Sequence, residues 1–237
     1  MGLKRATSVF FQNPDDAKLF VDAGMVDEKK IVFVPGSGVH TERFAAKPMP
    51  KEKRFLFVGR LIGDKGLREL LECARAMHRT HPDCAFDVVG YFDPNPTAMK
   101  PEDLQPYMDE GAIVFHGYQE NVLPYLEACY AFVLPSYHEG TPRAVLEAMA
   151  TGRPIVTTDV PGCRETVVDG ENGFLVPAKD AKALQAACER LYAEEALAER
   201  MAQASRRMAV EKFDVRIVNA RILKTIDRVR EGQEAEG

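Results

Sequence analysis

Two glutamates eight residues apart, Glu139 and Glu147, lie on either side of a run that should begin a helix. Thr141 is a common helix-capping residue and Pro142 suits the first helical position, so the helix is predicted to start there. Backbone amides near Gly140 would then point out of the helix N-terminus, where they can bind an anion. The two acids would repel that anion unless they contact hydroxyl groups instead.

The same residues also have an ordinary structural interpretation. Arg143 and Glu147 stand at spacing i, i+4 on one helix face, where an exposed ion pair contributes about 0.2–0.5 kcal/mol. Glu139 would then be a solvated acid of a loop. Taken alone, this run leaves both interpretations open.

A second cluster lies between a predicted strand and a predicted helix. It contains Gly59 and Arg60, followed by Lys65 and Gly66. Glycines let backbone amides approach an anion, and the following helix adds its positive N-terminal end. Two cations beside that loop suit a diphosphate. An ordinary turn with solvated cations is the alternative, because neither Gly-Lys-Ser/Thr nor Gly-x-Gly-x-x-Gly is present.

The elements that must position these clusters alternate between strands and helices. Short β-rich runs predict strands at residues 8–11, 31–34, 55–58, 86–89, 113–116, 131–134, 155–158 and 174–176. Helical patterns stand at 15–23, 67–79, 102–110, 123–128, 142–150 and 163–167, and from 181 onward with a break at 213–214. This alternation predicts an α/β fold, a Rossmann-like parallel sheet closed by C-terminal helices. Such sheets bind ligands at the carboxyl ends of their strands.

Composition narrows the functional classes. The chain carries 31 basic and 36 acidic residues with the signs interspersed, so a nucleic-acid partner is not expected. No apolar run approaches the roughly 18 residues that span a bilayer, and the N-terminus does not resemble a signal peptide. Basic residues between 206 and 230 indicate either a solvated helix face or a weak patch for anionic lipid head groups. The last residues, 231–237, are expected to form a disordered tail.

Neither a metal nor a disulfide framework is expected. The five cysteines include no Cys-x-x-Cys pair and fit a reducing cytoplasm. No Asp-x-Asp pair occurs, and His78 and His81 have no third ligand in view. The predicted cofactor content is therefore none.

The run from Glu139 to Ala150 matches the Glu-x7-Glu motif of the family 4 retaining glycosyltransferases, also called glycosyl transferases group 1. Further matches stand in the family's order at residues 58–61, 65–66, 114–118, 133–136, 152–156, 161–165 and 169–176. These enzymes have the two-domain GT-B fold. The chain resembles their C-terminal half, which binds the nucleotide-sugar donor.

The resemblance implies roles for individual residues. Arg60 and Lys65 match the pair that grips the donor diphosphate, and Glu139 matches the acid that contacts donor-sugar hydroxyls. These three are the expected catalytic residues. Glu147 matches the acid that holds the ribose. The remaining expected substrate-binding residues, by backbone contact to the phosphate or the base, are Gly59, His116, Gly117, Tyr118, Gly140, Thr141, Pro142 and Arg143.

Against the family pattern, most of the first domain is absent from this chain. Residues 1–45 resemble a remnant of that N-terminal acceptor domain with its linker, 46–212 the Rossmann-like domain, and 213–237 a crossover helix and tail. A missing N-terminal domain is thus an expected partner. The unpaired apolar surface of the remnant is expected to favour a homo-oligomer.

The function implied is retaining transfer of a hexose or N-acetylhexosamine from a nucleotide sugar to an acceptor. The expected donor is a UDP-sugar, and the expected acceptor is a lipid-linked saccharide or a polysaccharide of the cell surface. The expected location is cytoplasmic, with peripheral contact to the inner face of the membrane. Two alternatives remain, a non-catalytic module that binds nucleotide sugars and a nucleotide-sugar epimerase on the same fold.

Overall fold

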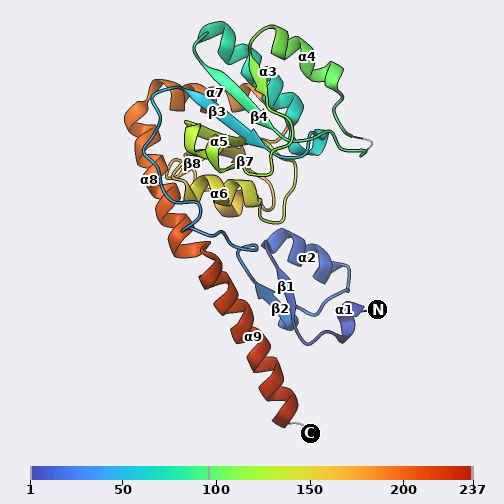
Figure 1. The fold of residues 1–237 in the computed structure, drawn as a ribbon. Helices are drawn as coiled ribbons and strands as arrows, with labels where there is room; N and C mark the ends of the chain where they lie inside the picture. The colour runs from blue at the N-terminus through green and yellow to red at the C-terminus, as the bar shows by residue number, and fades with distance from the viewer. Residues whose placement is uncertain (1, 96, 236–237) are drawn as a thin grey trace.

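A computed structural model describes residues 2–95 and 97–235, and it contains the expected parallel sheet (Figure 1). Six parallel strands lie in the order β5-β4-β3-β6-β7-β8. Their bounds are Arg54–Val58 for β3, Ala85–Val89 for β4, Ile113–Phe115 for β5, Ala131–Leu134 for β6, Ile155–Thr158 for β7 and Gly173–Val176 for β8. Strands β3, β4, β6 and β7 are largely buried and mostly apolar, as a sheet covered on both faces requires.

Helices cover both faces of this sheet. Helices α3 (Leu67–Thr80), α4 (Pro101–Asp109) and α7 (Ala181–Ala193) lie on one side, and α5 (Leu123–Ala128) and α6 (Arg143–Ala150) lie on the other (Figure 1). Each helix faces the sheet with an apolar stripe; on α3 this stripe includes Leu67, Leu70 and Leu71. The α/β class and the Rossmann-like sheet are confirmed.

The direction in which successive strands are added across the sheet reverses between β3 and β6, although all six strands are parallel. From β3 the chain proceeds through β4 to β5 at one edge, and from β6 through β7 to β8 at the other. Strands β3 and β6 pair directly, with Phe55 opposite Ala131. At such a switch point the loops after the two strands separate and leave a crevice. Both sequence clusters follow these two strands.

A small unit precedes the sheet domain. Strands β1 (Val9–Phe11) and β2 (Ile31–Phe33) form a separate two-stranded parallel sheet, with α1 (Gly2–Arg5), α2 (Pro14–Asp22) and the 3₁₀ turn η1 (Glu28–Lys30) around it. Its buried core contains Phe11, Ala17 and Val26, with Val9, Phe20 and Ile31 partly buried against them. Phe10 and Phe33 are exposed on this sheet. The expected self-association of such a surface stays a prediction.

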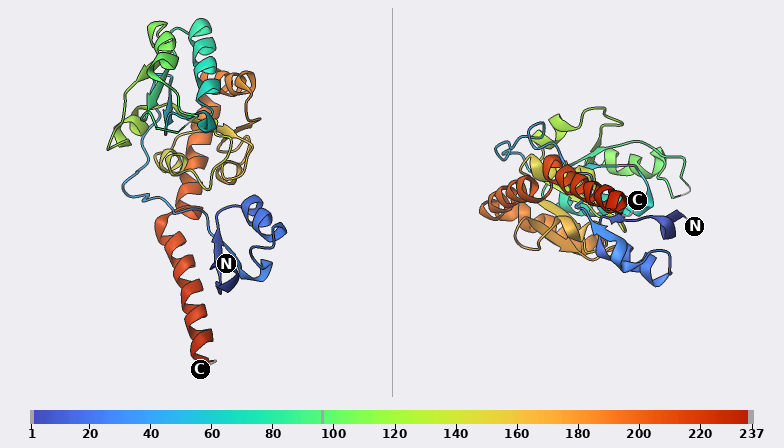
Figure 2. Two further views of the ribbon diagram at one scale, coloured as in Figure 1. Left: turned by 90° about the vertical axis from the view of Figure 1, so that its right-hand side faces the viewer. Right: turned by 90° about the horizontal axis from the view of Figure 1, so that it is seen from below.

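Two helices follow α7, namely α8 (Glu195–Lys212) and α9 (Val215–Ala235). Helix α9 runs away from the sheet domain alongside β1 and β2, as both views show (Figures 1 and 2). Where it begins, Val39 accepts from the amide of Val215 at 2.9 Å and donates to Phe213 O at 2.8 Å. The predicted break at 213–214 is therefore present, and a further break at Glu194 separates α7 from α8.

Two local predictions are wrong. Residues 163–167 do not form an α-helix, because only a 3₁₀ turn, η3 (Arg164–Thr166), fits before Val167 becomes extended. Residues 231–235 were expected to be disordered, but they continue helix α9. Glutamate, glutamine and alanine are good helix formers, and the single Gly232 among them costs about 1 kcal/mol without ending the helix. Residues 236–237 lie outside the described part.

Candidate active site

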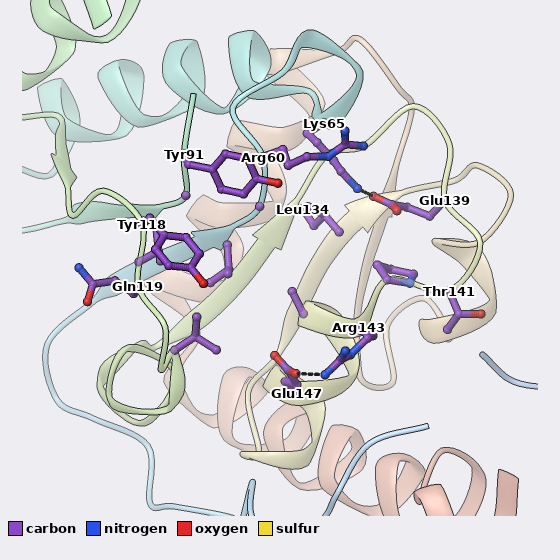
Figure 3. Close-up of a pocket in the computed structure, with 17 residues that line it drawn as sticks. Arg60, Lys65, Tyr91, Tyr118, Gln119, Leu134, Glu139, Thr141, Arg143 and Glu147 are labelled. Atoms are coloured by element: carbon purple, nitrogen blue, oxygen red, sulfur yellow. Dashed lines mark hydrogen bonds and ion pairs between the residues drawn. The ribbon is translucent and has the colours of Figure 1, made fainter. Parts of the chain in front are cut away.

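A cleft of about 600 Å³ opens at the carboxyl ends of β3 and β6. Figure 3 shows the side chains around it in three groups. Arg60, Lys65 and Glu139 lie along one side, Arg143 and Glu147 lie across from them, and two tyrosines close a third side. The cleft therefore combines residues of both clusters that the sequence singled out.

The loop after β3 is held close to its neighbours by backbone contacts. The Gly59 amide donates to Val89 O at 3.0 Å, and residues Gly63–Lys65 form the 3₁₀ turn η2. Gly66 then adopts a left-handed conformation with φ of 67° and starts α3. A Cβ atom at Gly66 would lie 2.0 Å from Pro135 O, so glycine alone permits this approach.

The two cations of this loop have different surroundings. Arg60 is about half exposed, at 46%, and lies 3.4 Å from a carboxylate oxygen of Asp93. Lys65 is 20% exposed, and its Nζ contacts Oε1 of Glu139 directly. Arg60 can therefore turn to a ligand at little cost, whereas Lys65 must first leave Glu139.

Glu139 is held on several sides. The hydroxyl of the buried Ser136 donates to Glu139 Oε1 at 2.7 Å, in addition to the contact with Lys65. The Glu139 amide donates to Pro161 O at 3.0 Å. With 12% of its side chain exposed, the carboxylate faces the cleft in a fixed position.

The prediction that Thr141 caps α6 is wrong. Pro142 occupies the cap position with extended backbone, and the helix begins at Arg143. The Thr141 hydroxyl is buried and has no hydrogen-bond partner among the described residues, because its side chain packs against Gly36. The first amides that the helix leaves without an intrahelical acceptor are those of Arg143 and Ala144.

Glu147 lies on the cleft side of α6. It is 3.5 Å from Arg143, which is 74% exposed, while the Glu147 side chain is only 13% exposed. Burial raises the pKa of Glu147, and the charges of Arg143 and Arg43 only partly oppose that effect. A buried carboxylate with one weak partner is suited to receiving hydroxyl hydrogen bonds from a ligand.

Replacing Glu147 with glutamine should therefore stabilise the free protein at neutral pH. Because the pKa of Glu147 is raised in the folded state, ionisation of this carboxyl lowers the free energy of unfolding. The loss is absent at pH values below the ordinary pKa of 4.5, and it grows as the pH rises from there toward the folded-state pKa. The gain in free energy of unfolding should be absent at pH 4 and present at pH 8 in urea titrations. Glu194→Gln is the control, since Glu194 has the same i, i+4 arginine partner but is half exposed. An equal gain at both pH values would contradict this account.

Two aromatic rings close the side of the cleft near β4 and β5. Tyr118 was predicted there, whereas Tyr91 and Gln119 were missed. The rings of Tyr91 and Tyr118 meet edge to face with centroids 6.0 Å apart. Tyr91 stands two residues beyond the end of β4, so the rule that ligands bind at strand ends could have found it.

Three predicted contact residues do not line the cleft. The His116 ring turns to Asp87, 2.7 Å away, and its carbonyl accepts from Gln119 at 2.8 Å. The Gly117 carbonyl accepts from the Gly90 amide at 3.0 Å. Gly140 faces Gln12 of the N-terminal unit, whose Oε1 would lie 2.5 Å from a Cβ atom at this position. The backbone of 116 and 117 is thus already engaged, because it supports the turn that carries Tyr118.

Within residues 2–95 and 97–235, no group of three or more histidine, cysteine, aspartate or glutamate side chains could hold a metal ion. The five cysteines are free and buried. Over the same part of the chain, no helix is both long enough and apolar enough to cross a membrane.

Comparison with known proteins places the cleft in context. The profile of the family "Glycosyl transferases group 1" matches residues 52–194. The chain is 30% identical to an N,N'-diacetylbacillosaminyl-diphospho-undecaprenol alpha-1,3-N-acetylgalactosaminyltransferase of Campylobacter jejuni, over 97% of this chain and 62% of the relative. The fold of this chain matches that of Anabaena HepE in complex with UDP-glucose. The TM-score is 0.81 at 20% identity, over 96% of this chain and 65% of HepE.

The third match fixes which half is present. This chain also matches the C-terminal domain of a group 1 glycosyltransferase, LpcC from Francisella tularensis, with a TM-score of 0.67 and 25% identity. The match covers 75% of this chain and 99% of that domain. The fold is thus that of a GT-B C-terminal domain. The chain belongs to the glycosyl transferases group 1 family, and the predicted family and enzyme class are confirmed. It spans about three fifths, 62%, of the length of the Campylobacter relative.

Proposed function

We propose that the cleft binds a UDP-sugar and that the protein transfers the sugar, a hexose or N-acetylhexosamine, with retention at the anomeric carbon. The observation that carries the proposal is one cleft in which Arg60 and Lys65 face the start of α6 and two carboxylates. The names of relatives support it, since HepE was solved with UDP-glucose and the Campylobacter enzyme is an N-acetylgalactosaminyltransferase acting on a diphospho-undecaprenol.

Charge on the leaving group is the central electrostatic problem. Breaking the bond to the anomeric carbon places negative charge on the diphosphate oxygens. Arg60, Lys65 and the free amides at the start of α6 would surround those oxygens with fixed positive potential. These groups are already positioned by the fold, so they need little rearrangement during the reaction.

Donor binding would break the ion pair between Lys65 and Glu139. A diphosphate offers Lys65 two charged groups in place of one, and a donor sugar offers hydroxyls to the released Glu139 carboxylate. Ser136 would still hold Glu139 during this exchange. In this arrangement Glu139 and Lys65 remain the proposed catalytic pair, together with Arg60.

The rest of the nucleotide would extend along the cleft. Glu147 would accept from the ribose hydroxyls, which explains a carboxylate that is buried with only a weak partner. The rings of Tyr91 and Tyr118 would pack against the uracil base. Such an orientation places the sugar near Glu139, beside the N-terminal unit.

Transfer itself would need an acceptor within about 3–3.5 Å of the anomeric carbon. We propose that residues 1–45 belong to the acceptor domain, that 46–212 bind the donor, and that 213–237 cross back to the acceptor side. The proposed acceptor is a lipid-linked saccharide or a polysaccharide of the cell surface. A cytoplasmic location at the inner face of the membrane would bring the protein to a lipid-linked acceptor.

Calorimetry with UDP tests the donor assignment. Arg60→Ala should weaken UDP binding by about 1.5–3 kcal/mol, roughly 10- to 150-fold, because it removes a charged hydrogen bond to the diphosphate. Arg207→Ala is the matched control: Arg207 is also about half exposed and paired with an acid, Glu171, but it lies outside the cleft. Equal affinity of wild type and Arg60→Ala would rule the assignment out.

A further inference from the structure

The first turn of α2 lies directly against the loop that carries Glu139. Asp16 Oδ1 is 2.9 Å from His138 Nε2, and Asp15 is 3.3 Å from Arg164. The donor-binding loop is therefore in contact with a segment more than 120 positions away in sequence. Figure 1 shows this arrangement, with α2 beside the lower end of the sheet domain.

Asn13 is the buried centre of this contact. Its side chain is fully buried and caps α2, with Oδ1 accepting from the Asp16 amide at 2.8 Å. Its Nδ2 group donates to Asp16 Oδ2 at 2.8 Å and to the main-chain carbonyl of Glu139 at 3.5 Å. The cap needs only an oxygen, so the amide nitrogen is the part of Asn13 that reaches across to the donor loop.

The Glu139 carbonyl has little freedom on its other side. A Cβ atom at Gly162 would lie 2.0 Å from that oxygen, so the chain at Gly162 already touches it. At the next residue, a Cβ atom on Gly140 would lie 2.5 Å from Oε1 of Gln12. The peptide that follows Glu139 is thus enclosed between residues 12–13 on one side and Gly162 on the other.

We propose that Asn13 is a positioning residue for donor-sugar recognition, acting through the backbone of Glu139. This inference rests on the proposed function, in which the Glu139 carboxylate binds the sugar. Once Lys65 turns to the diphosphate, Ser136 is the side-chain partner that the carboxylate keeps among the described residues. The position of its backbone, and so the contact with Asn13, then decides how well it meets the sugar hydroxyls.

The same contact links the two parts of the chain. Asn13 follows β1 and starts α2, whereas Glu139 follows β6. Any displacement of the N-terminal unit from the sheet domain separates Asn13 Nδ2 from the Glu139 carbonyl. Sugar recognition should therefore depend on docking of the N-terminal unit, while recognition of the nucleotide alone should not.

Calorimetry with UDP, UDP-glucose and UDP-N-acetylglucosamine tests this role. Asn13→Ser keeps a capping oxygen but has no group that reaches Glu139, and Asn13→Asp keeps the shape of the side chain without its N–H groups. In Asn13→Ser the affinity for UDP should stay within about twofold of wild type. The affinity for the UDP-sugar that wild type prefers should fall about three- to tenfold, as expected for one lost hydrogen bond.

The ratio of the two affinities separates this role from a structural one. Loss of the cap or partial unfolding would weaken UDP and UDP-sugar together, so it would leave the ratio unchanged. The added charge of Asn13→Asp affects UDP and UDP-sugar alike, so it cancels in the ratio of UDP-sugar affinity to UDP affinity. The loss of the N–H groups should therefore lower this ratio as it does in Asn13→Ser. Lys18→Ala is the control on the same helix, because Lys18 is 75% exposed and pairs with Asp22 of its own helix.

The outcomes distinguish the two levels of the argument. A wild-type ratio of affinities in both Asn13 variants, with UDP still bound, would overturn the role of Asn13 and leave the donor site intact. A wild-type protein that binds none of the three ligands would overturn the proposed function, and this inference with it. A ratio reduced as far in Lys18→Ala as in Asn13→Ser would also overturn the role of Asn13, because Lys18→Ala leaves the Asn13 side chain in place.

Discussion

Replacing Arg153 with alanine is expected to lower the free energy of unfolding by about 3–5 kcal/mol. Its side chain is fully buried, and its guanidinium donates to Leu126 O, Glu127 O and Pro48 O at 2.9–3.1 Å. Alanine would leave these carbonyls without a donor and open a cavity the size of the arginine. Urea unfolding followed by circular dichroism measures the loss.

Two further variants make the result specific. Arg79→Ala should change the free energy of unfolding by less than about 0.5 kcal/mol, because Arg79 is exposed on α3. Arg153→Lys should recover only part of the loss, since one ammonium group cannot reproduce the planar set of donors. A loss below about 1 kcal/mol in Arg153→Ala would mean that water replaces the guanidinium at all three carbonyls.

Arg153 ties Pro48, in the segment that leads into β3, to the sheet domain, and a second arginine performs the same task further along. Arg206 Nη1 donates to the carbonyls of Thr41, Phe44 and Ala150 at 2.7–3.1 Å. Thr41 in turn donates to the buried carboxylate of Asp214, at the start of α9. The chain thus fixes both segments that leave the sheet domain, so the N-terminal unit and α9 emerge side by side.

Much of the sheet domain could be predicted because its signals are local. Mostly apolar runs such as Arg54–Val58 and Ala131–Leu134 stand at the centre of the sheet, and the loops that carry Lys65 and Glu139 follow those two strands. Because parallel strands end at the same edge, the two clusters had to meet. The family resemblance then named Arg60, Lys65, Glu139 and Glu147, which all line the cleft.

The errors arose where contacts between distant residues override local preference. Thr141 has the chemistry of a cap, but the close approach of Gly36 turns its side chain away from the helix. His116 could have faced the cleft, but Asp87 lies within 2.7 Å on the sheet. Gly36 is far from Thr141 in sequence, and Asp87 is far from His116, so no local pattern predicts either contact.

The contact between Asn13 and the Glu139 loop was missed for the same reason. In sequence, Asn13 before Pro14 signals only the start of a helix. Its second role depends on how the N-terminal unit docks on the sheet domain, which a sequence pattern does not encode. A residue can thus satisfy a local rule completely and still serve a distant site.

Replacing Gly66 with alanine is the second substitution expected to have a large effect, a loss of about 2–5 kcal/mol in the free energy of unfolding. The residue has φ of 67°, and an added Cβ would lie 2.0 Å from Pro135 O. That oxygen belongs to the backbone just after β6, so it cannot move away without shifting the loop of Glu139. Lys65, the preceding residue, would be displaced as well, so UDP affinity should fall together with stability.

Gly24 provides the matched comparison, because it has nearly the same backbone angle, φ of 64°, but no atom within 4 Å of an added Cβ. Gly24→Ala should cost only the left-handed conformation, about 1–2 kcal/mol, and should leave UDP binding unchanged. The difference between the two losses measures the close approach of the loop after β3 to the end of β6. Equal losses in the free energy of unfolding for Gly66→Ala and Gly24→Ala would show that the two loops are not in close contact at Gly66. The position of Lys65 would then not depend on that contact.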